Sequence, residues 1–153
     1  MKEIINSAIE IEVPEGFERM YEEDLNTVYG NEDPNRWGIW DKEKHIMITL
    51  TWQKNGLLET IADLKKVRDN AMTDVSKIVT DFKDMELTER KFSGEKAYGF
   101  RYGYRVEDVE QISEHLVIRH NGCLYALITA CRKELLAASS MYTEAILNSI
   151  RLL

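Results

Sequence analysis

The chain has 153 residues and a formal net charge of −7, and its contents of hydrophobic residues (44%) and charged residues (31%) are ordinary for a globular protein. A chain of this length buries roughly 70% of the surface that its unfolded form exposes. We therefore expect residues 1–153 to form a single domain that needs no disulfide or metal to stabilise it. The acidic balance argues against a nucleic-acid partner, because an acidic surface repels the phosphate backbone.

The composition also bears on location. The first 17 residues alternate acids with isolated apolar side chains and lack the apolar run of a signal peptide. No stretch approaches the ~20 apolar residues of a membrane span. Cys123 and Cys131 lie about 27 Å apart on one predicted strand, too far for a disulfide, which suits a reducing compartment. We expect a cytoplasmic protein if the chain is complete, and an exported one if a leader has been removed.

The negative charge is concentrated in the N-terminal third. Residues 1–50 carry twelve acidic and five basic residues, whereas residues 51–153 carry fifteen of each. This excess of acids is interpreted either as a solvated surface or as a surface for a basic partner or a cation. Its main cluster comprises Glu10, Glu12, Glu15, Glu18, Glu22, Glu23 and Asp24.

In this third, the pattern predicts a strand, a short helix and a β-hairpin. Isoleucine and valine alternate with acids over residues 9–13, the period of a half-buried strand, and a Pro-Glu-Gly turn ends it. The acidic stretch 17–29 is interpreted as one short helix. Residues 37–40 and 45–53 have the pattern of strands and are joined by a polar turn, so we expect them to pair as a hairpin.

From Leu57 the pattern changes to that of an amphipathic helix. Apolar residues recur at spacings of three and four as far as about Val79, with charged residues between them. One helix to about Val79 is expected, and the alternative is two helices divided at the internal N-cap that Thr73 and Asp74 offer.

The rest of the chain predicts a four-stranded meander and a closing helix. The strands are expected at 84–92, 97–105, 111–119 and 123–132, and Asn121-Gly122 is a strong turn signal between the last two. Residues 135–150 carry one apolar stripe and form the closing helix. The chain is therefore predicted to be an α+β protein: a mainly antiparallel sheet of about six or seven strands flanked by two main helices, an α/β/α sandwich.

No recognisable catalytic motif is present. The chain lacks G-x-S-x-G, G-x-x-x-x-G-K-[ST], G-x-G-x-x-G and C-x-x-C, which argues against a triad hydrolase, a phosphate-binding loop and structural zinc. His115 and His120 are five residues apart on one strand and face opposite sides, so we do not expect them to share a metal. We predict no catalytic residue, no metal and no cofactor.

One predicted strand presents a stripe of aromatic rings. Tyr98, Phe100, Tyr102 and Tyr104 recur at every second residue, whereas Arg101 lies on the reverse face of the strand. Four such rings need a cover, either a helix or a ligand. In the second interpretation the tyrosine hydroxyls line an apolar pocket, as small-molecule sites require.

Three tryptophans lie in or near the first hairpin. Alternation separates Trp37 from Trp40, so at least one of them should be at the surface if only one face of the sheet is buried. An exposed Trp beside acidic residues is typical of a surface that binds a protein partner.

The order of elements resembles the PsbP-like superfamily. The resemblance is carried by the opening Ile9-x-Ile11-x-Val13-Pro14-x-Gly16-Phe17, the strand 46–52, the helix from Leu57, the meander with residues 98–104, and the closing helix through Tyr142 and Ile150. It implies an antiparallel sheet between helices. It also implies a non-enzymatic accessory or binding protein, and it assigns no functional residue.

Three functional hypotheses follow. The first is an accessory module, monomeric or homodimeric, that binds a protein partner or small ligand through Trp37, Trp40 and the acidic N-terminal third. The second is a small-molecule enzyme or carrier whose pocket is lined by Tyr98, Tyr102 and Tyr104, with polar anchors drawn from Arg101, Arg105 and His115. The third is an immunity-type protein that binds a basic partner.

Overall fold

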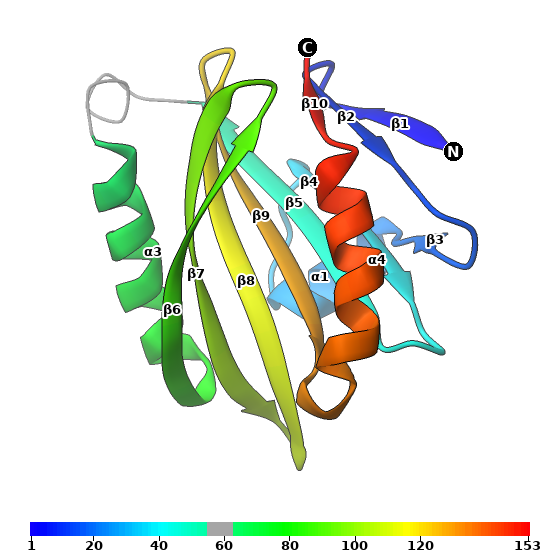
Figure 1. The fold of residues 1–153 in the computed structure, drawn as a ribbon, viewed down its shortest axis with the longest axis vertical. Helices are drawn as coiled ribbons and strands as arrows, with labels where there is room; N and C mark the ends of the chain where they lie inside the picture. The colour runs from blue at the N-terminus through cyan, green and yellow to red at the C-terminus, as the bar shows by residue number, and fades with distance from the viewer. Residues whose placement is uncertain (55–62) are drawn as a thin grey trace.

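The computed structural model describes residues 1–54 and 63–153 (Figure 1). The elements in chain order are β1 (Lys2–Ile5), β2 (Ile9–Glu12), β3 (Glu18–Arg19), α1 (Glu22–Tyr29), β4 (Arg36–Asp41), β5 (Ile46–Lys54), α3 (Leu64–Ile78), β6 (Thr80–Phe92), β7 (Glu95–Val106), β8 (Val109–His120), β9 (Cys123–Arg132), the 3-10 turn η1 (Lys133–Leu135), α4 (Leu136–Asn148) and β10 (Arg151–Leu152).

The described strands form two antiparallel sheets. The large sheet has the order β3-β4-β5-β9-β8-β7-β6, and the small one has the order β1-β2-β10. The predicted hairpin of β4 and β5 and the meander from β6 to β9 are both confirmed. Between β8 and β9, Asn121 and Gly122 have φ values of 48° and 74°, the left-handed conformation that a type I′ turn requires at both positions.

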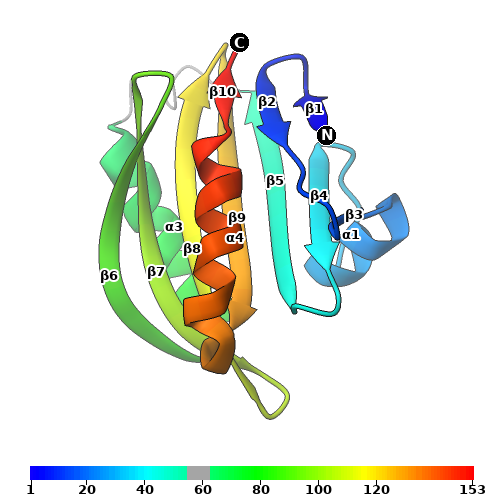
Figure 2. The same cartoon turned by 45° about the vertical axis from the view of Figure 1, so that its right-hand side comes forward.

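Helices cover both faces of the large sheet, so the predicted α/β/α sandwich is confirmed. Helix α4 and the small sheet lie on one face, and α3 and α1 lie on the other (Figures 1 and 2). We call these the α4 face and the α3 face. Both chain termini lie at the small sheet, where the backbone N–H of Leu153 donates to the carbonyl of Ala8.

The main hydrophobic core lies between the α4 face and its cover. It forms because strands β4, β5, β8 and β9 place every second residue on this side. Its members include Ile5, Ile9, Ile11, Trp37, Ile39, Ile48, Leu50, Leu116, Ile118, Tyr125, Leu127, Ile146 and Leu147.

The structure differs from the prediction in several helices and strands. Strands β1, β3 and β10 were not predicted, and the expected helix over 17–29 begins only at Glu22. Helix α3 runs unbroken through Thr73 and Asp74, so the proposed split does not occur, and its N-cap is Asp63, whose carboxylate accepts from the N–H of Lys65. The expected helical stretch 57–62 lies outside the described residues. Strand β6 begins at Thr80, four residues before the predicted start, because its N-terminal part carries bulges that interrupt the alternation.

Gly99 is a point of close approach in the large sheet. A Cβ at this position would lie 2.5 Å from the backbone oxygen of His115 and 2.8 Å from side chains of Leu116 and Thr88. We expect Gly99→Ala to lower the free energy of unfolding by about 1–3 kcal/mol through overpacking, as measured by urea denaturation. Gly103 on the same strand is the matched control, because its nearest neighbours lie at 3.7–3.8 Å. Equal losses for Gly99→Ala and Gly103→Ala would contradict the steric explanation.

Candidate binding site

Strand register decides which of the predicted site residues lie together. One row of cross-strand neighbours runs from Trp40 through Met47, Ala130 and Ser113 to Tyr102. Because directly opposed residues in an antiparallel sheet point to the same side, Trp40 shares the α3 face with the tyrosine stripe. The sequence did not indicate this juxtaposition of the two aromatic groups.

Trp37 lies on the opposite face and is buried. Its side chain is only 1% exposed and belongs to the core under the small sheet. Its indole Nε1 lies 3.4 Å from a carboxylate oxygen of Glu3. The prediction that Trp37 contributes to a binding surface is therefore wrong, since nothing can reach it without opening the core. The register of β4 and β5 places Trp40 on the other face of the sheet, as alternation predicted. Its side chain is half-buried, so neither Trp37 nor Trp40 is the fully exposed tryptophan that the prediction expected.

Arg101 also lies on the α4 face, away from the tyrosine rings. Its guanidinium contacts Glu86 and lies 3.4 Å from Glu114. Both contacts hold it in an ion-pair network beneath α4. The structure therefore does not bring Arg101 together with Tyr98, Tyr102 and Tyr104, and its predicted role as an anchor for a ligand beside those rings is wrong.

This network joins three strands to α4. Arg90 of β6 donates to both oxygens of Glu114 at 2.9 and 2.8 Å and to both oxygens of Glu144 of α4 at 2.9 and 2.7 Å. Glu114 is only 4% exposed. Hydrogen bonds from Arg90 hold the pKa of Glu144 below its usual value. The arrangement satisfies the charges internally.

Most of the tyrosine stripe is covered by protein. Tyr102 is 5% exposed and stacks between Phe82 and Phe100, with ring centroids 5.5 and 5.3 Å away. The hydroxyl of Tyr104 accepts a hydrogen bond from Ser113 at 3.0 Å. Burial raises the pKa of both phenols, so they are neutral at pH 7. Tyr98 is half-buried, with the ammonium of Lys65 from α3 placed 5.4 Å from its ring centroid.

Part of the α3 face lies between the two helices that cover it. Helix α3 contacts β7 and β8, and α1 contacts β4, where Leu25 packs over Gly38. On this part of the face four apolar side chains of β4, β5 and β9 are only half-buried, whereas their neighbours Thr49 and Ala130 are buried. We call this area the open strip; it consists of Trp40, Met47, Ala126 and Ile128. Its edge is charged, because Glu18 is the cross-strand neighbour of Trp40 and the ammonium of Lys42 lies 4.6 Å from the ring.

His115, one of the polar anchors suggested for a ligand in the second hypothesis, is buried in the large sheet. It lies in the row of Phe100 and Ile128, is 8% exposed, and stacks on Phe100 with ring centroids 5.1 Å apart. Burial lowers the pKa of His115 to about 4. The signal available in the sequence was its place in the middle of the predicted strand 111–119, next to the apolar run Leu116–Ile118; residues 112–118 all prove to be buried.

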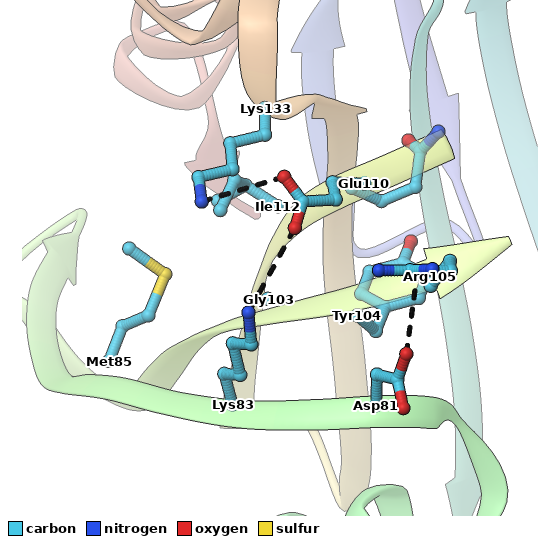
Figure 3. Close-up of a pocket in the computed structure, with 10 residues that line it drawn as sticks. Asp81, Lys83, Met85, Gly103, Tyr104, Arg105, Glu110, Ile112 and Lys133 are labelled. Atoms are coloured by element: carbon cyan, nitrogen blue, oxygen red, sulfur yellow. Dashed lines mark ion pairs between the residues drawn. The ribbon is translucent and has the colours of Figure 1, made fainter. Parts of the chain in front are cut away.

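A hollow of about 130 Å³ lies beside strands β6, β7 and β8, lined in part by Asp81, Gly103 and Glu110 (Figure 3). Gly103 and Ile112 contribute to its lining, and three cations surround it. Each cation has an acidic partner: Lys83 and Lys133 lie 3.9 and 3.6 Å from Glu110, and Arg105 lies 3.4 Å from Asp81. Because each cation is already paired with a carboxylate, the hollow offers no uncompensated positive charge for an anionic ligand.

Metal ligands do not gather in the described part of the chain, where no group of three or more His, Cys, Asp or Glu side chains is placed to hold an ion. Within the same residues, no helix has the length and apolar character to cross a membrane.

Comparisons with solved structures identify the fold of this chain. No protein-family model and no curated protein sequence matches the chain. Among solved structures, cyanobacterial PsbP from Synechocystis matches with a TM-score of 0.67 and 12% identity, over 100% of this chain and 92% of that one. The chain has the PsbP-like fold. The resemblance predicted from the sequence is thereby confirmed.

Two further structures with the PsbP-like fold have different described roles. The Ran-binding protein Mog1p of Saccharomyces cerevisiae matches with a TM-score of 0.63 and 9% identity, over 99% of this chain and 94% of that one. LpqN, involved in cell envelope biogenesis of Mycobacterium tuberculosis, matches with a TM-score of 0.60 and 15% identity, over 94% and 82%. Identities this low establish the fold alone, so the argument for function has to come from this chain's own surfaces.

Proposed function

We propose that this protein is a non-catalytic binding module that holds a protein partner on the open strip. The observation that carries the proposal is the alignment of half-buried Trp40, Met47 and Ile128 on one sheet face between α1 and α3. Trp and Met are enriched in protein interfaces. The protein-binding role in the description of Mog1p supports the idea that a PsbP-like fold can present such a surface.

We infer the partner's chemistry from the charges near the strip. Glu18 lies next to Trp40 and the first turn of α1 carries Glu22, Glu23 and Asp24, so these acids outnumber Lys42, whose ammonium lies over the Trp40 ring. These acids repel an acidic partner and attract a basic one, which speeds encounter and selects the orientation of docking. The proposed partner is therefore a protein segment whose apolar side chains are flanked by lysine or arginine.

Trp40→Ala tests this function. Partners are first captured on the wild-type protein, and the affinity of each purified partner is then measured by calorimetry. We expect Trp40→Ala to weaken binding by about 30-fold, the effect of losing one aromatic hot spot, and to lower the melting temperature by only a few degrees. Met141→Ala is the matched control, because Met141 is 73% exposed on α4, across the sheet from the strip.

Two outcomes would contradict the proposal. Loss of binding in Met141→Ala with retention in Trp40→Ala would place the interface on the α4 side. A large loss of stability in Trp40→Ala would identify Trp40 as a core residue instead of a contact residue.

A further inference from the structure

Strand β6 forms one edge of the large sheet. It has 13 residues, and among the described strands only β7 pairs with it, so that it is the outermost strand in Figure 2. Bulges interrupt its first part, whereas Glu86–Phe92 keeps a continuous register with β7. The outer side of an edge strand carries backbone N–H and C=O groups that can pair with a further strand. We call Glu86–Phe92 the β6 edge.

An exposed apolar side chain lies within the β6 edge. Leu87 is 56% exposed and opposes Phe100, so it lies on the α3 face. Natural proteins protect their sheet edges with bulges and charged side chains, but the bulges of this strand all come before Glu86. An added strand would give Leu87 a cross-strand neighbour, and such pairs stabilise sheets.

The hollow of Figure 3 lies next to this edge, on the α4 face. Lys83 of β6 opposes Gly103, and Gly103 opposes Ile112, a member of the main core. Lys83 and Met85 extend from β6 on one side of the hollow, and Glu110 faces them across Gly103 (Figure 3). The space exists because Gly103 has no side chain: a Cβ at this position would have its nearest neighbours at 3.7–3.8 Å.

The lining of this hollow favours an uncharged aliphatic side chain. Met85, Gly103 and Ile112 contribute apolar surface, and the cations around it already have acidic partners. The volume of about 130 Å³ is slightly below that of an apolar cavity of about 150 Å³ that takes up benzene. A valine, leucine or isoleucine side chain therefore fits, whereas an indole is too large.

A second copy of this chain does not offer such a side chain. The residues of the β6 edge on the α4 face are Glu86, Thr88, Arg90 and Phe92. Glu86 and Arg90 are charged, and Phe92 is buried in the main core. A symmetric pair of β6 strands would present these same residues to the hollow. The occupant is therefore a segment of a different protein.

We propose that the β6 edge is a second protein-binding site, which takes up an extended segment of another protein and places one of its aliphatic side chains in the hollow beside Gly103. In such added strands, backbone hydrogen bonds give affinity and side-chain pockets give specificity. Alternate residues of a strand point to opposite faces, so a second apolar residue, an odd number of positions from the first, covers Leu87. The site shares no residue with the open strip and is independent of the proposed function.

The test uses a phage-displayed library of random 12-residue peptides, which is selected on the whole protein and followed by calorimetry with synthetic copies of the enriched peptides. We expect one-to-one binding of peptides that carry two apolar residues separated by an odd number of positions, one of them aliphatic. Hydrogen exchange of the β6 amides should slow on binding, because outward N–H groups of the edge gain partners.

Two variants locate the bound peptide. Gly103→Val fills the hollow and should weaken binding at least about tenfold, the effect of leaving one aliphatic side chain in water. Leu87→Lys places a charge on the edge, which opposes strand addition, and should weaken binding by a similar factor. Ile4→Lys is the matched control and should bind like the wild type, because Ile4 is 61% exposed on β1, an edge of the small sheet.

Failure to enrich any peptide would overturn the proposal, as would equal affinity of the enriched peptides for the wild type, Gly103→Val and Leu87→Lys, or unchanged exchange of the β6 amides. Trp40→Ala should bind the peptides normally, and a loss of binding there would place them on the open strip. Acidic residues at the position of the aliphatic anchor would contradict the assigned chemistry. A dimer in sedimentation that Leu87→Lys dissociates would identify a second copy as the occupant and so refute the assignment to a different protein.

Discussion

Replacing Arg90 by alanine should lower the free energy of unfolding by about 3 kcal/mol, because it leaves the buried carboxylate of Glu114 without its main ion-pair partner. Removal of one partner from a buried ion pair typically costs about 3–5 kcal/mol. Glu114 is nearly inaccessible to water, and Arg90 supplies two of its hydrogen bonds. We expect the low end of the range, since Arg101 stays within 3.4 Å of Glu114 and compensates part of its charge. Urea denaturation at pH 7 measures the effect.

Lys83→Ala is the control for this prediction. The ammonium of Lys83 lies 3.9 Å from Glu110, and both side chains are exposed. Exposed pairs of this kind contribute about 0–1 kcal/mol. The double replacement Arg90→Met with Glu114→Leu should recover much of the stability lost in Arg90→Ala, because it removes the buried charge together with its partner. A loss in Arg90→Ala no greater than that in Lys83→Ala would mean that Glu114 gains access to water in the variant.

The strong period-two patterns of the sequence predict most of the large sheet. Alternation from residue 84 onward is clear because one face meets a closed core, where a slip of one residue would bury charged side chains. The same alternation separates Trp37 from Trp40 and Arg101 from the tyrosines. The two-residue strands β3 and β10 are not predictable in this way, because a strand so short carries no period of its own.

The composition of the candidate site depends on strand order, which the pattern does not contain. Alternation tells which residues of one strand share a face, but it says nothing about the relation between strands that are distant in sequence. Trp40 and Tyr102 come to one face only because β5 pairs with β9, a strand about 75 residues further along the chain. The sequence therefore predicted two separate aromatic groups, where the structure has one face that carries both.

The two covers of the sheet differ in a way that bears on function. The α4 face is covered by an apolar core and an ion-pair network, so Arg90, Glu114 and Glu144 already have partners. The α3 face retains the half-buried open strip and, beside it, a hollow of about 270 Å³ next to α3. The α3 face is therefore the side on which we propose that a partner binds, because its half-buried side chains are not fully covered by the fold's own contacts.

Stability should also depend on pH through His115. Its pKa is about 4 in the folded protein because burial disfavours the imidazolium, whereas an unfolded chain has a histidine pKa of about 6.5. Between these values the unfolded state binds more protons, so the free energy of unfolding rises with pH. The contribution of His115 is complete above about pH 6.5 and decreases by about 3 kcal/mol as the pH falls towards 4.

The variant His115→Phe isolates this effect, since it keeps a ring on Phe100 and removes the titrating group. We compare the free energies of unfolding of both proteins by urea denaturation from pH 4.5 to 7.5. The difference between them should be constant above about pH 6.5, and below that pH the wild type should lose stability relative to the variant. The carboxylates that titrate in the same range are common to both proteins and cancel in the difference. Parallel curves would mean that the folded protein protonates His115 as readily as the unfolded chain does, and hence that water or a movement of α3 reaches the imidazole.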